Sequence, residues 1–502
     1  MRCLVTGATG YIGSRLVPRL LDGGHTVRCL TRSAARLRDV PWADDVEIVE
    51  GDLTDAPSVA RAVAGVDVVY YLVHSMGQPG FEKIDRVAAT NVAGAARAAG
   101  VRRIVYLGGP EPEVDHPASA HLRSRAEVAH ILLDSGVPTV VLRAAVIIGS
   151  GSASFEMLRH LTERLPAMVT PRWVHNPVQP LAIGDVLYYL VGSATLPEGI
   201  SRAFDIGGPE VLSYGDMMRR YAAVVGLRRR LIIPVRPLTP RLSSHWVGLV
   251  TPVPAAIAKP LVASLVHEAV AHERDITHHL PDPPGGLTRF DGAVRAALAG
   301  TGEIDDNDLP VPEAWTADPA RPLPTDPPWS GRSAYTELRR RPVAAPPEVL
   351  WGVIEGIGGE QGWYSFPLAW SVRGWLDELV GGVGLRPGRT HPHHLQAGDQ
   401  LDFWRVEKIV PGRLLRLRAE MRLPGRAWLE MRAMPRPDGR ADYLQRAVFV
   451  PRGLAGHLYW AAVWPFHTLI FGGMARNIAA TAARNAVRTL PAIRNPYRRS
   501  RD

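Results

Sequence analysis

The sequence predicts an α/β protein with a doubly wound parallel sheet and a helical extension over residues 1–300, followed by a smaller α+β domain over 333–492. Three observations support this division. Short apolar runs alternate with helical segments in the first part, which is typical of buried parallel strands covered by helices on both faces. Seven prolines stand among acidic residues between 302 and 329, which indicates a linker at 301–332. Eight of the thirteen tryptophans follow this linker.

Each element follows from its apolar pattern. Runs of apolar residues predict strands in the first domain at 2–6, 26–31, 46–50, 66–73, 103–107 and 137–148. Helical spacing predicts helices at 11–21, 121–135, 155–165, 183–194 and 214–226. In the second domain the order is a strand at 334–343, a helix at 347–357, strands at 400–406, 414–419, 427–434 and 441–449, and a helix at 454–484. We expect a curved antiparallel sheet gripped by this last helix, then a basic tail at 493–502.

Composition excludes several classes of protein. With 46% apolar and 21% charged residues the chain folds rather than remaining disordered. Cys3 and Cys29 are the only cysteines, too few for a disulfide scaffold or a cysteine zinc site. The chain enters a strand pattern directly after Met1, without the pattern of a signal peptide, so we expect a cytoplasmic protein.

Neither a nucleic-acid partner nor a metal site is expected. The net charge of +9 comes almost entirely from arginine, a skew typical of GC-rich codon usage rather than of a phosphate-tracking groove. His391, His393 and His394 lie in a Gly/Pro-rich stretch without neighbouring cysteine or carboxylate ligands, so we predict no metal there.

A glycine-rich turn is the strongest motif. It directly follows the first strand and opens a helix, and its residues are Gly7, Thr9, Gly10, Tyr11, Ile12 and Gly13. The first glycine permits a tight turn, the second lets the backbone approach a pyrophosphate, and the third allows close helix–strand packing. Free N–H groups at the helix N-terminus would face the phosphates. The motif therefore predicts a dinucleotide-binding site, with a ligand-free glycine turn as the alternative.

The residues at the end of the second strand determine whether NAD or NADP is preferred. An Asp or Glu there favours NAD, whereas an arginine accommodates the extra phosphate of NADP. This chain has Thr31, Arg32 and Arg36 and no carboxylate before Asp39, which favours NADP over NAD. The alternative is that Arg32 is one surface arginine among many.

Two further segments are expected to contact the dinucleotide. Asp52 and Leu53 follow the third strand and would lie near the adenine. Leu72 and His74 follow the fourth strand and would lie near the ribose and the nicotinamide.

These motifs resemble the extended and atypical short-chain dehydrogenase/reductase superfamily over about residues 1–300, supported further by 51–53, 91–94, 142–149 and 205–210. The whole chain resembles the YbjT-like family on the segments 121–125, 171–174 and 459–467. This resemblance implies a Rossmann, NmrA-like domain followed by a domain related to the Bet v 1/START (SRPBCC) helix-grip fold. A domain of that fold implies a cavity for a small apolar ligand, although ordinary core packing also explains its aromatic residues.

The chain departs from this superfamily at its catalytic pair. Catalytic members use Tyr-x-x-x-Lys, whereas the residues four positions before the three lysines here are Pro79, Ala255 and Trp404. His121 and Arg125 stand one helical turn apart at the corresponding helix. His121 could act as a general acid and Arg125 as the partner of a substrate oxygen. The alternative is that both merely cap and solvate the helix.

Residues 453–475 contain no Lys, Arg, Asp or Glu and are long enough to span a bilayer. They also contain His457, Pro465 and His467 and coincide with the long helix expected to grip the sheet. A core helix is favoured, peripheral membrane contact comes second and a transmembrane span third.

The sequence favours an NAD(P)H-binding, atypical oxidoreductase acting on a quinone-, lipid- or enone-like substrate. The alternative is a non-catalytic nucleotide-binding redox sensor of NmrA-like type, or an accessory or assembly protein resembling the Rossmann subunit of respiratory complex I. The missing Tyr-x-x-x-Lys pair leaves the assignment as an enzyme open, and the preference for one rests on fold analogy alone.

Overall fold

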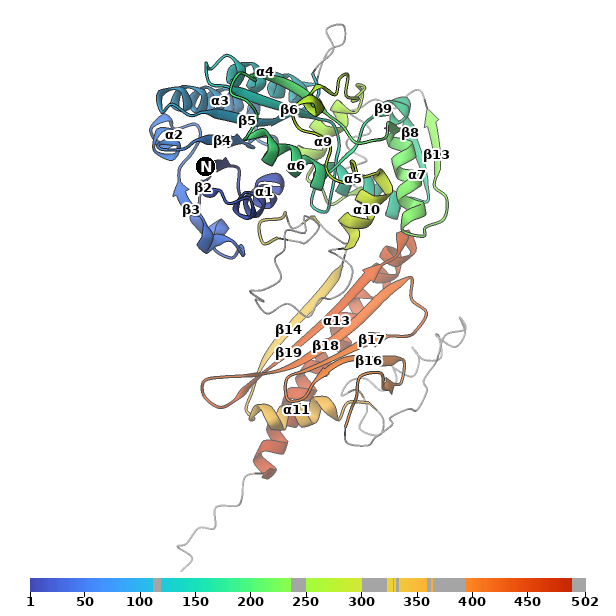
Figure 1. Ribbon diagram of the computed structural model, residues 1–502. Coiled ribbons are helices and arrows are strands. Elements are labelled where there is room, and N and C mark those ends of the chain that lie inside the picture. The colour runs from blue at the N-terminus through green and yellow to red at the C-terminus, as the bar shows by residue number, and fades with distance from the viewer. Residues whose placement is uncertain are drawn as a thin grey trace, which may run out of the picture. The chain divides into compact units, whose positions relative to one another are not determined.

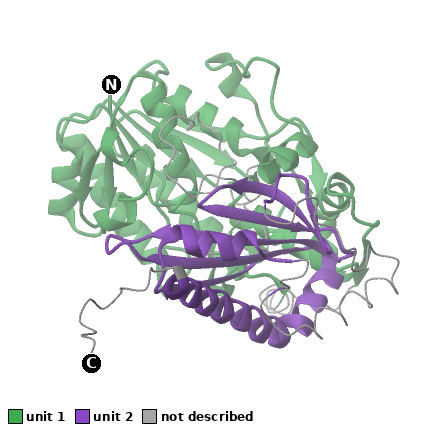
Figure 2. Ribbon diagram, turned by 90° about the horizontal axis from the view of Figure 1, so that it is seen from below, with its two compact units in different colours: residues 1–332 green, residues 333–502 purple. Residues whose placement is uncertain are grey.

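The computed structural model describes residues 1–111, 119–235, 250–299, 323–327, 329–330, 334–358, 363 and 394–489. The chain divides into two compact units, Met1–Arg332 and Ser333–Asp502 (Figures 1 and 2). The predicted tail, most of the predicted linker, and His391 and His393 lie outside the described residues.

The first unit is built on a seven-stranded parallel sheet with the order β11-β6-β5-β4-β1-β2-β3. Its strands are β1 (Arg2–Thr6), β2 (Thr26–Thr31), β3 (Glu47–Glu50), β4 (Val68–Tyr71), β5 (Arg103–Gly108), β6 (Thr139–Ala144) and β11 (Arg202–Ile206). The strand order reverses direction between β1 and β4, and in open α/β sheets ligands bind outside the carboxyl ends of the strands at such a point. The doubly wound parallel sheet is confirmed.

Helices cover both faces of this sheet (Figure 1). They are α1 (Tyr11–Asp22) and α6 (Ile183–Ser193) on one face, and α2 (Ala56–Val63), α3 (Phe81–Ala98) and α4 (Ala120–Leu133) on the other. Strand residues alternate between the two cores: Val5 packs with Leu16 of α1, whereas its neighbour Leu4 packs with Val92 of α3. Such strands are buried on both sides, which explains why their sequences are almost continuously apolar.

The extension after β6 has its own core around α5 and α7. Its helices are α5 (Ala153–Arg164), α7 (Tyr214–Val224), α9 (Ala255–Ser264) and α10 (Phe290–Ala299). Short pairs of strands accompany them: β7 (Ile147–Ile148) with β10 (Leu181–Ala182), β9 (Pro177–Val178) with β12 (Leu212–Ser213), and β8 (Ala167–Pro171) with β13 (Leu231–Val235). The prediction of one strand at 137–148 was wrong, because the chain leaves the main sheet after Ala144 and β7 pairs with β10.

The second unit is a six-stranded antiparallel sheet of order β14-β19-β18-β17-β16-β15, with α11 and α13 packed on it (Figure 1). The elements are β14 (Tyr335–Val343), α11 (Pro347–Glu355), β15 (Gln400–Leu401), β16 (Trp404–Val410), β17 (Leu414–Ala419), β18 (Gly425–Pro435), β19 (Ala441–Pro451) and α13 (Gly453–Thr489). A separate antiparallel sheet domain is thus confirmed, while its assignment to the helix-grip fold stays a prediction.

Between sheet and helices the described residues form an apolar core that includes Ile354 of α11, Leu417 and Leu429 of the sheet, and Ile478 of α13. The predicted single strand at 400–406 was wrong. Asp402 takes a left-handed conformation (φ 55°), which Asp tolerates better than most residues, and the chain turns there between β15 and β16. None of the described helices is both long and apolar enough to cross a membrane.

Candidate functional site

A cavity of about 370 Å³ opens at the carboxyl ends of β1, β4, β5 and β6 in the first unit. One side is formed by the glycine turn and the start of α1, and the opposite side by α4, α5 and α9. Eight of the predicted site residues line it: Gly10, Tyr11, Ile12, Gly13, Leu72, His74, His121 and Arg125. The cavity therefore lies at the reversal of strand order, where the fold places a ligand.

The glycines of the turn are required by its geometry. Gly7 has φ +77°, and a Cβ on it would lie 2.9 Å from the carbonyl oxygen of Leu72. A Cβ on Gly13 would lie 2.3 Å from the carbonyl oxygen of Gly7. The amide of Gly10 donates to that same carbonyl oxygen at 2.8 Å, which closes the turn. Any side chain at Gly13 would force α1 away from the turn.

The N-terminus of α1 is suited to an anion. Its N-cap is Gly10, which offers no side chain to the first N–H groups, and its first turn contains no acidic residue. These N–H groups lack intrahelical partners and lie at the positive end of the helix dipole. Tyr11 adds a buried hydroxyl that has no hydrogen-bond partner among the described residues, and burial raises its pKa, so it remains protonated. The hydroxyl lies against the backbone of Gly149, so the free N–H groups of the helix, and not Tyr11 Oη, fit the pyrophosphate of a dinucleotide.

Two imidazoles and one guanidinium meet on the far side of the cavity. His121 and Arg125 come from the first two turns of α4, and His74 comes from the segment after β4. The Arg125 guanidinium is fixed, because Nη2 donates to the carbonyl oxygen of Leu107 at 2.6 Å and the group lies 5.5 Å from the ring centroid of Tyr106. Neither imidazole is hydrogen-bonded to a described residue, so their ring nitrogens remain available to a ligand.

The protein environment keeps both imidazoles neutral. Burial, followed by the charges of Arg125 and His74, lowers the pKa of His121 to about 3. Burial among protein atoms and the Arg125 charge also lower the pKa of His74, although its ring is accessible to water from the cavity. The prediction of His121 as a general acid assumed a pKa near the working range, and this environment instead favours a neutral imidazole that donates a hydrogen bond.

Several predicted site residues lie away from the cavity lining. Gly7 shapes the turn from behind, and Thr9 is half-buried there. The hydroxyl of Thr31 donates to the carbonyl oxygen of Ser33 at 3.1 Å and so closes the turn after β2. Arg32 and Arg36 are exposed beyond that turn.

Asp52 and Leu53 follow β3 and also lie outside the lining. A hydrogen bond from the backbone of Thr54 lowers the pKa of Asp52 and fixes its carboxylate. Leu53 is buried, and its carbonyl oxygen accepts from the side-chain amide of Asn91 at 2.8 Å. Both residues are thereby held in a rigid loop at the end of β3.

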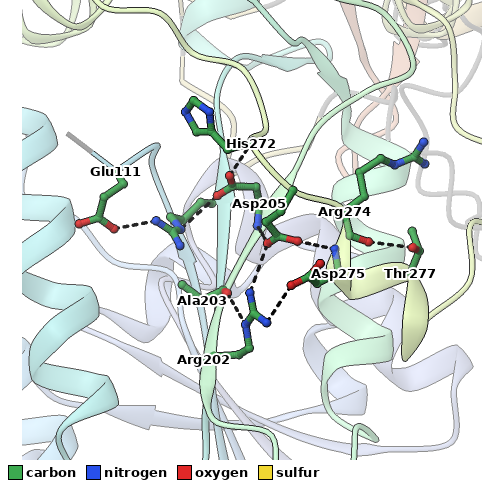
Figure 3. Close-up of polar contacts among 10 residues, drawn as sticks. Glu111, Arg202, Ala203, Asp205, His272, Arg274, Asp275 and Thr277 are labelled. Carbon is green, nitrogen blue, oxygen red and sulfur yellow. Dashed lines mark hydrogen bonds and ion pairs between the residues drawn. The ribbon is translucent and has the colours of Figure 1, made fainter. Parts of the chain in front are cut away.

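Sequence reasoning missed a polar network at the ends of β6 and β11 (Figure 3). Glu111 lines the cavity and accepts from Arg143 of β6 at 2.7 Å, and Arg143 also pairs with Asp205 of β11 at 3.2 Å. Asp205 in turn accepts the backbone N–H of His272 at 2.9 Å. The signal available in the sequence was a charged residue near the end of each strand, Arg143 in β6 and Asp205 in β11.

Two other contributions were also missed. Glu50, at the end of β3, accepts the backbone N–H of Ala34 at 2.6 Å and so brings a carboxylate to the end of β2. Pro327 and Trp329, from the segment predicted as linker, line the cavity. Among the described residues, no group of three His, Cys, Asp or Glu side chains is placed to hold a metal ion.

Comparison with known families finds a matching segment near each end of the chain. Residues 7–150 match a family described as NAD(P)H-binding, and residues 329–474 match a family described as a protein of unknown function, DUF2867. Among solved structures, the triphenylmethane reductase of a Citrobacter species complexed with NADP(H) covers 59% of this chain and 100% of that chain, with 20% identity and a TM-score of 0.47.

Two curated relatives each match nearly half of the chain. A (4-alkanoyl-5-oxo-2,5-dihydrofuran-3-yl)methyl phosphate reductase of Streptomyces griseus is 31% identical over 44% of this chain and 73% of the relative. A 3 beta-hydroxysteroid dehydrogenase/Delta 5-->4-isomerase of Mycobacterium tuberculosis is 28% identical over 45% of this chain and 70% of the relative. With its parallel sheet and glycine turn, the chain belongs to the NAD(P)H-binding family of Rossmann-fold, short-chain dehydrogenase/reductase-like proteins, and it carries a DUF2867 domain after that unit.

Proposed function

We propose that this protein is an oxidoreductase that uses NADPH, in preference to NADH, to reduce an apolar quinone-, lipid- or enone-like substrate. One observation carries the proposal: a single cavity joins the phosphate-binding turn to an apolar wall that holds His74, His121 and Arg125. Relatives named as a reductase and as a dehydrogenase support the class of reaction.

The class of substrate is inferred from the wall opposite the turn. Leu122, Met157, Ile257 and Leu261 project there from three different helices. Apolar side chains with a few convergent polar groups are typical of sites for small apolar ligands. The polar groups at the α4 end would then orient the oxygen of the substrate.

The nicotinamide, when bound, supplies the hydride. The N-terminus of α1 would hold the pyrophosphate. Arg125, held by the Leu107 carbonyl oxygen, would stabilise the negative charge that develops on the substrate oxygen. His121 would donate a hydrogen bond to this oxygen as a neutral imidazole, and water in the cavity would supply the proton.

A second candidate function has its own support. No Tyr-x-x-x-Lys pair exists in the sequence, and a neutral His121 is a poor proton donor at pH 7. A nucleotide-binding sensor or accessory protein needs the cofactor turn but no proton donor. Such a protein would bind NADPH at the same turn without oxidising it.

The test combines calorimetric titration with NADPH and NADH and a screen of quinones and enones for NADPH oxidation. His121→Phe and Arg125→Met should retain NADPH binding within a few-fold and lose turnover by about 100-fold or more. Arg123→Met is the matched control, since Arg123 is exposed and does not line the cavity. Unchanged turnover in both cavity variants would remove them from the mechanism. Tight NADPH binding without turnover on any acceptor would support the sensor instead.

A further inference from the structure

The first half of α13 carries an exposed apolar face. Its members are Leu454, Leu458, Trp464, Phe466 and Leu469. Leu458, Phe466 and Leu469 keep 62%, 67% and 57% of their surface accessible. Leu454, Leu458 and Leu469 follow a spacing of four and eleven residues and form one stripe, with Trp464 and Phe466 on its two flanks. At 1.5 Å per residue this apolar face is about 23 Å long.

The opposite side of the same helix is locked to the sheet. Trp460 stacks on Tyr335 and on Phe449, with ring centroids 5.0 and 5.5 Å apart. His467 Nδ1 is hydrogen-bonded to the carboxylate oxygen Oε2 of Glu337 at 2.7 Å. Because these contacts fix the rotation of α13, the apolar face cannot turn into its own core.

Every charged residue of the helix that carries the apolar face is an arginine. No Asp or Glu occurs between Gly453 and Thr489, and no charged residue at all occurs between 453 and 475. Arg452 and Arg476, both exposed, bound this uncharged stretch. A rigid apolar stripe with aromatic flanks and basic ends has the features of a helix that lies in the interface of a membrane. The basic ends complement anionic headgroups, which attract each such residue with about 1 kcal/mol.

We propose that this face of α13 docks on the surface of an anionic phospholipid bilayer. Leu458, Phe466 and Leu469 enter the boundary between headgroups and acyl chains, while Arg452 and Arg476 contact lipid phosphates. A bilayer requires no shape complementarity from a single convex helix, whereas a protein partner does. The helix lies along the surface, and its other side remains packed on β14 and β19.

The test is co-sedimentation of the full chain with vesicles of phosphatidylcholine alone or mixed with phosphatidylglycerol. We expect binding to the mixed vesicles only, weakening as salt is added because the basic ends are screened. The double variant Phe466→Ser/Leu469→Ser should bind about 100-fold more weakly, because it loses the free energy gained when two large apolar side chains leave water. Leu338→Ser is the matched control, because Leu338 is an equally exposed leucine (61%) on the face of β14 that points away from α13. Its neighbours Glu337 and Arg339 are on the other face and contact α13.

A second pair of substitutions separates charge from apolar contact. Arg452→Glu/Arg476→Glu should abolish binding to mixed vesicles, and its thermal unfolding, compared with that of the parent protein, separates loss of binding from loss of fold. Equal binding to neutral and anionic vesicles would overturn the assignment to an anionic surface. Absence of vesicle binding would overturn membrane docking. If light scattering then found a dimer that Phe466→Ser/Leu469→Ser dissociates, the face would belong to a second copy of the chain.

Discussion

Arg15 and Asp326, which are 311 positions apart, form a two-point ion pair beside the phosphate-binding turn. Nη1 lies 2.7 Å from Oδ1 and Nη2 lies 2.8 Å from Oδ2, and both side chains are buried. The same guanidinium lies 4.3 Å from the ring centroid of Tyr11, which lines the cavity. A segment predicted as linker therefore supports the first helix of the Rossmann unit.

Replacing Asp326 by Asn should destabilise the first unit by about 3–5 kcal/mol, because a buried arginine would lose its carboxylate partner. Urea unfolding of the full chain would measure this loss. The double variant Arg15→Met/Asp326→Leu removes both charges and should recover most of the stability. If Asp326→Asn unfolded at the same urea concentration as the parent, the ion pair would contribute nothing to the fold.

Gly13→Ala should abolish NADPH binding, because the added Cβ would lie 2.3 Å from the carbonyl oxygen of Gly7 and displace the start of α1. Calorimetric titration with NADPH measures the effect. Gly94→Ala is the control: Gly94 lies in α3 with nothing within 4 Å of its added Cβ, so this variant should bind normally and gain up to about 1 kcal/mol of stability. Normal binding by Gly13→Ala would contradict the assignment of the phosphate site.

The sequence predicted the elements whose signals are local. The glycine spacing located the turn, the apolar runs located β1 and β2 to the residue, and the four-residue spacing of His121 and Arg125 placed both on the cavity side of α4. Boundaries failed where the chain turns within an apolar run, as it does at Asp402.

Contacts between distant segments could not be read from the sequence. The pairing of Arg15 with Asp326 and the approach of Glu50 to the end of β2 depend on the packed fold, not on neighbouring residues. The chemistry of His121 was likewise hidden, because its pKa is set by burial and by Arg125 in space. Residue types thus predicted several of the side chains that line the cavity, while their protonation required the structure.

The depressed pKa of His121 predicts a pH dependence of stability. The ordinary value is 6.5 and the folded value is about 3, so between these pH values the unfolded chain binds a proton that the folded chain does not. Stability should therefore fall as the pH drops below about 6.5, by up to about 1.4 kcal/mol per pH unit for this group. His121→Phe should have a shallower slope in urea unfolding across that range. His278→Phe, at an exposed histidine, is the control, and an unchanged slope in His121→Phe would contradict the prediction.

Arg32 should decide the preference for NADPH over NADH. It is exposed just after β2, where a guanidinium can pair with the ribose phosphate, and a charge-assisted hydrogen bond is worth about 1.5–3 kcal/mol. Arg32→Ala should weaken NADPH binding by about 10- to 100-fold and leave NADH binding nearly unchanged, while Arg61→Ala, an exposed control on α2, should alter neither. Glu50→Gln should strengthen NADPH binding, because it removes a carboxylate from the end of β2. Equal losses of affinity for NADPH and NADH in Arg32→Ala would show that this arginine does not bind the ribose phosphate.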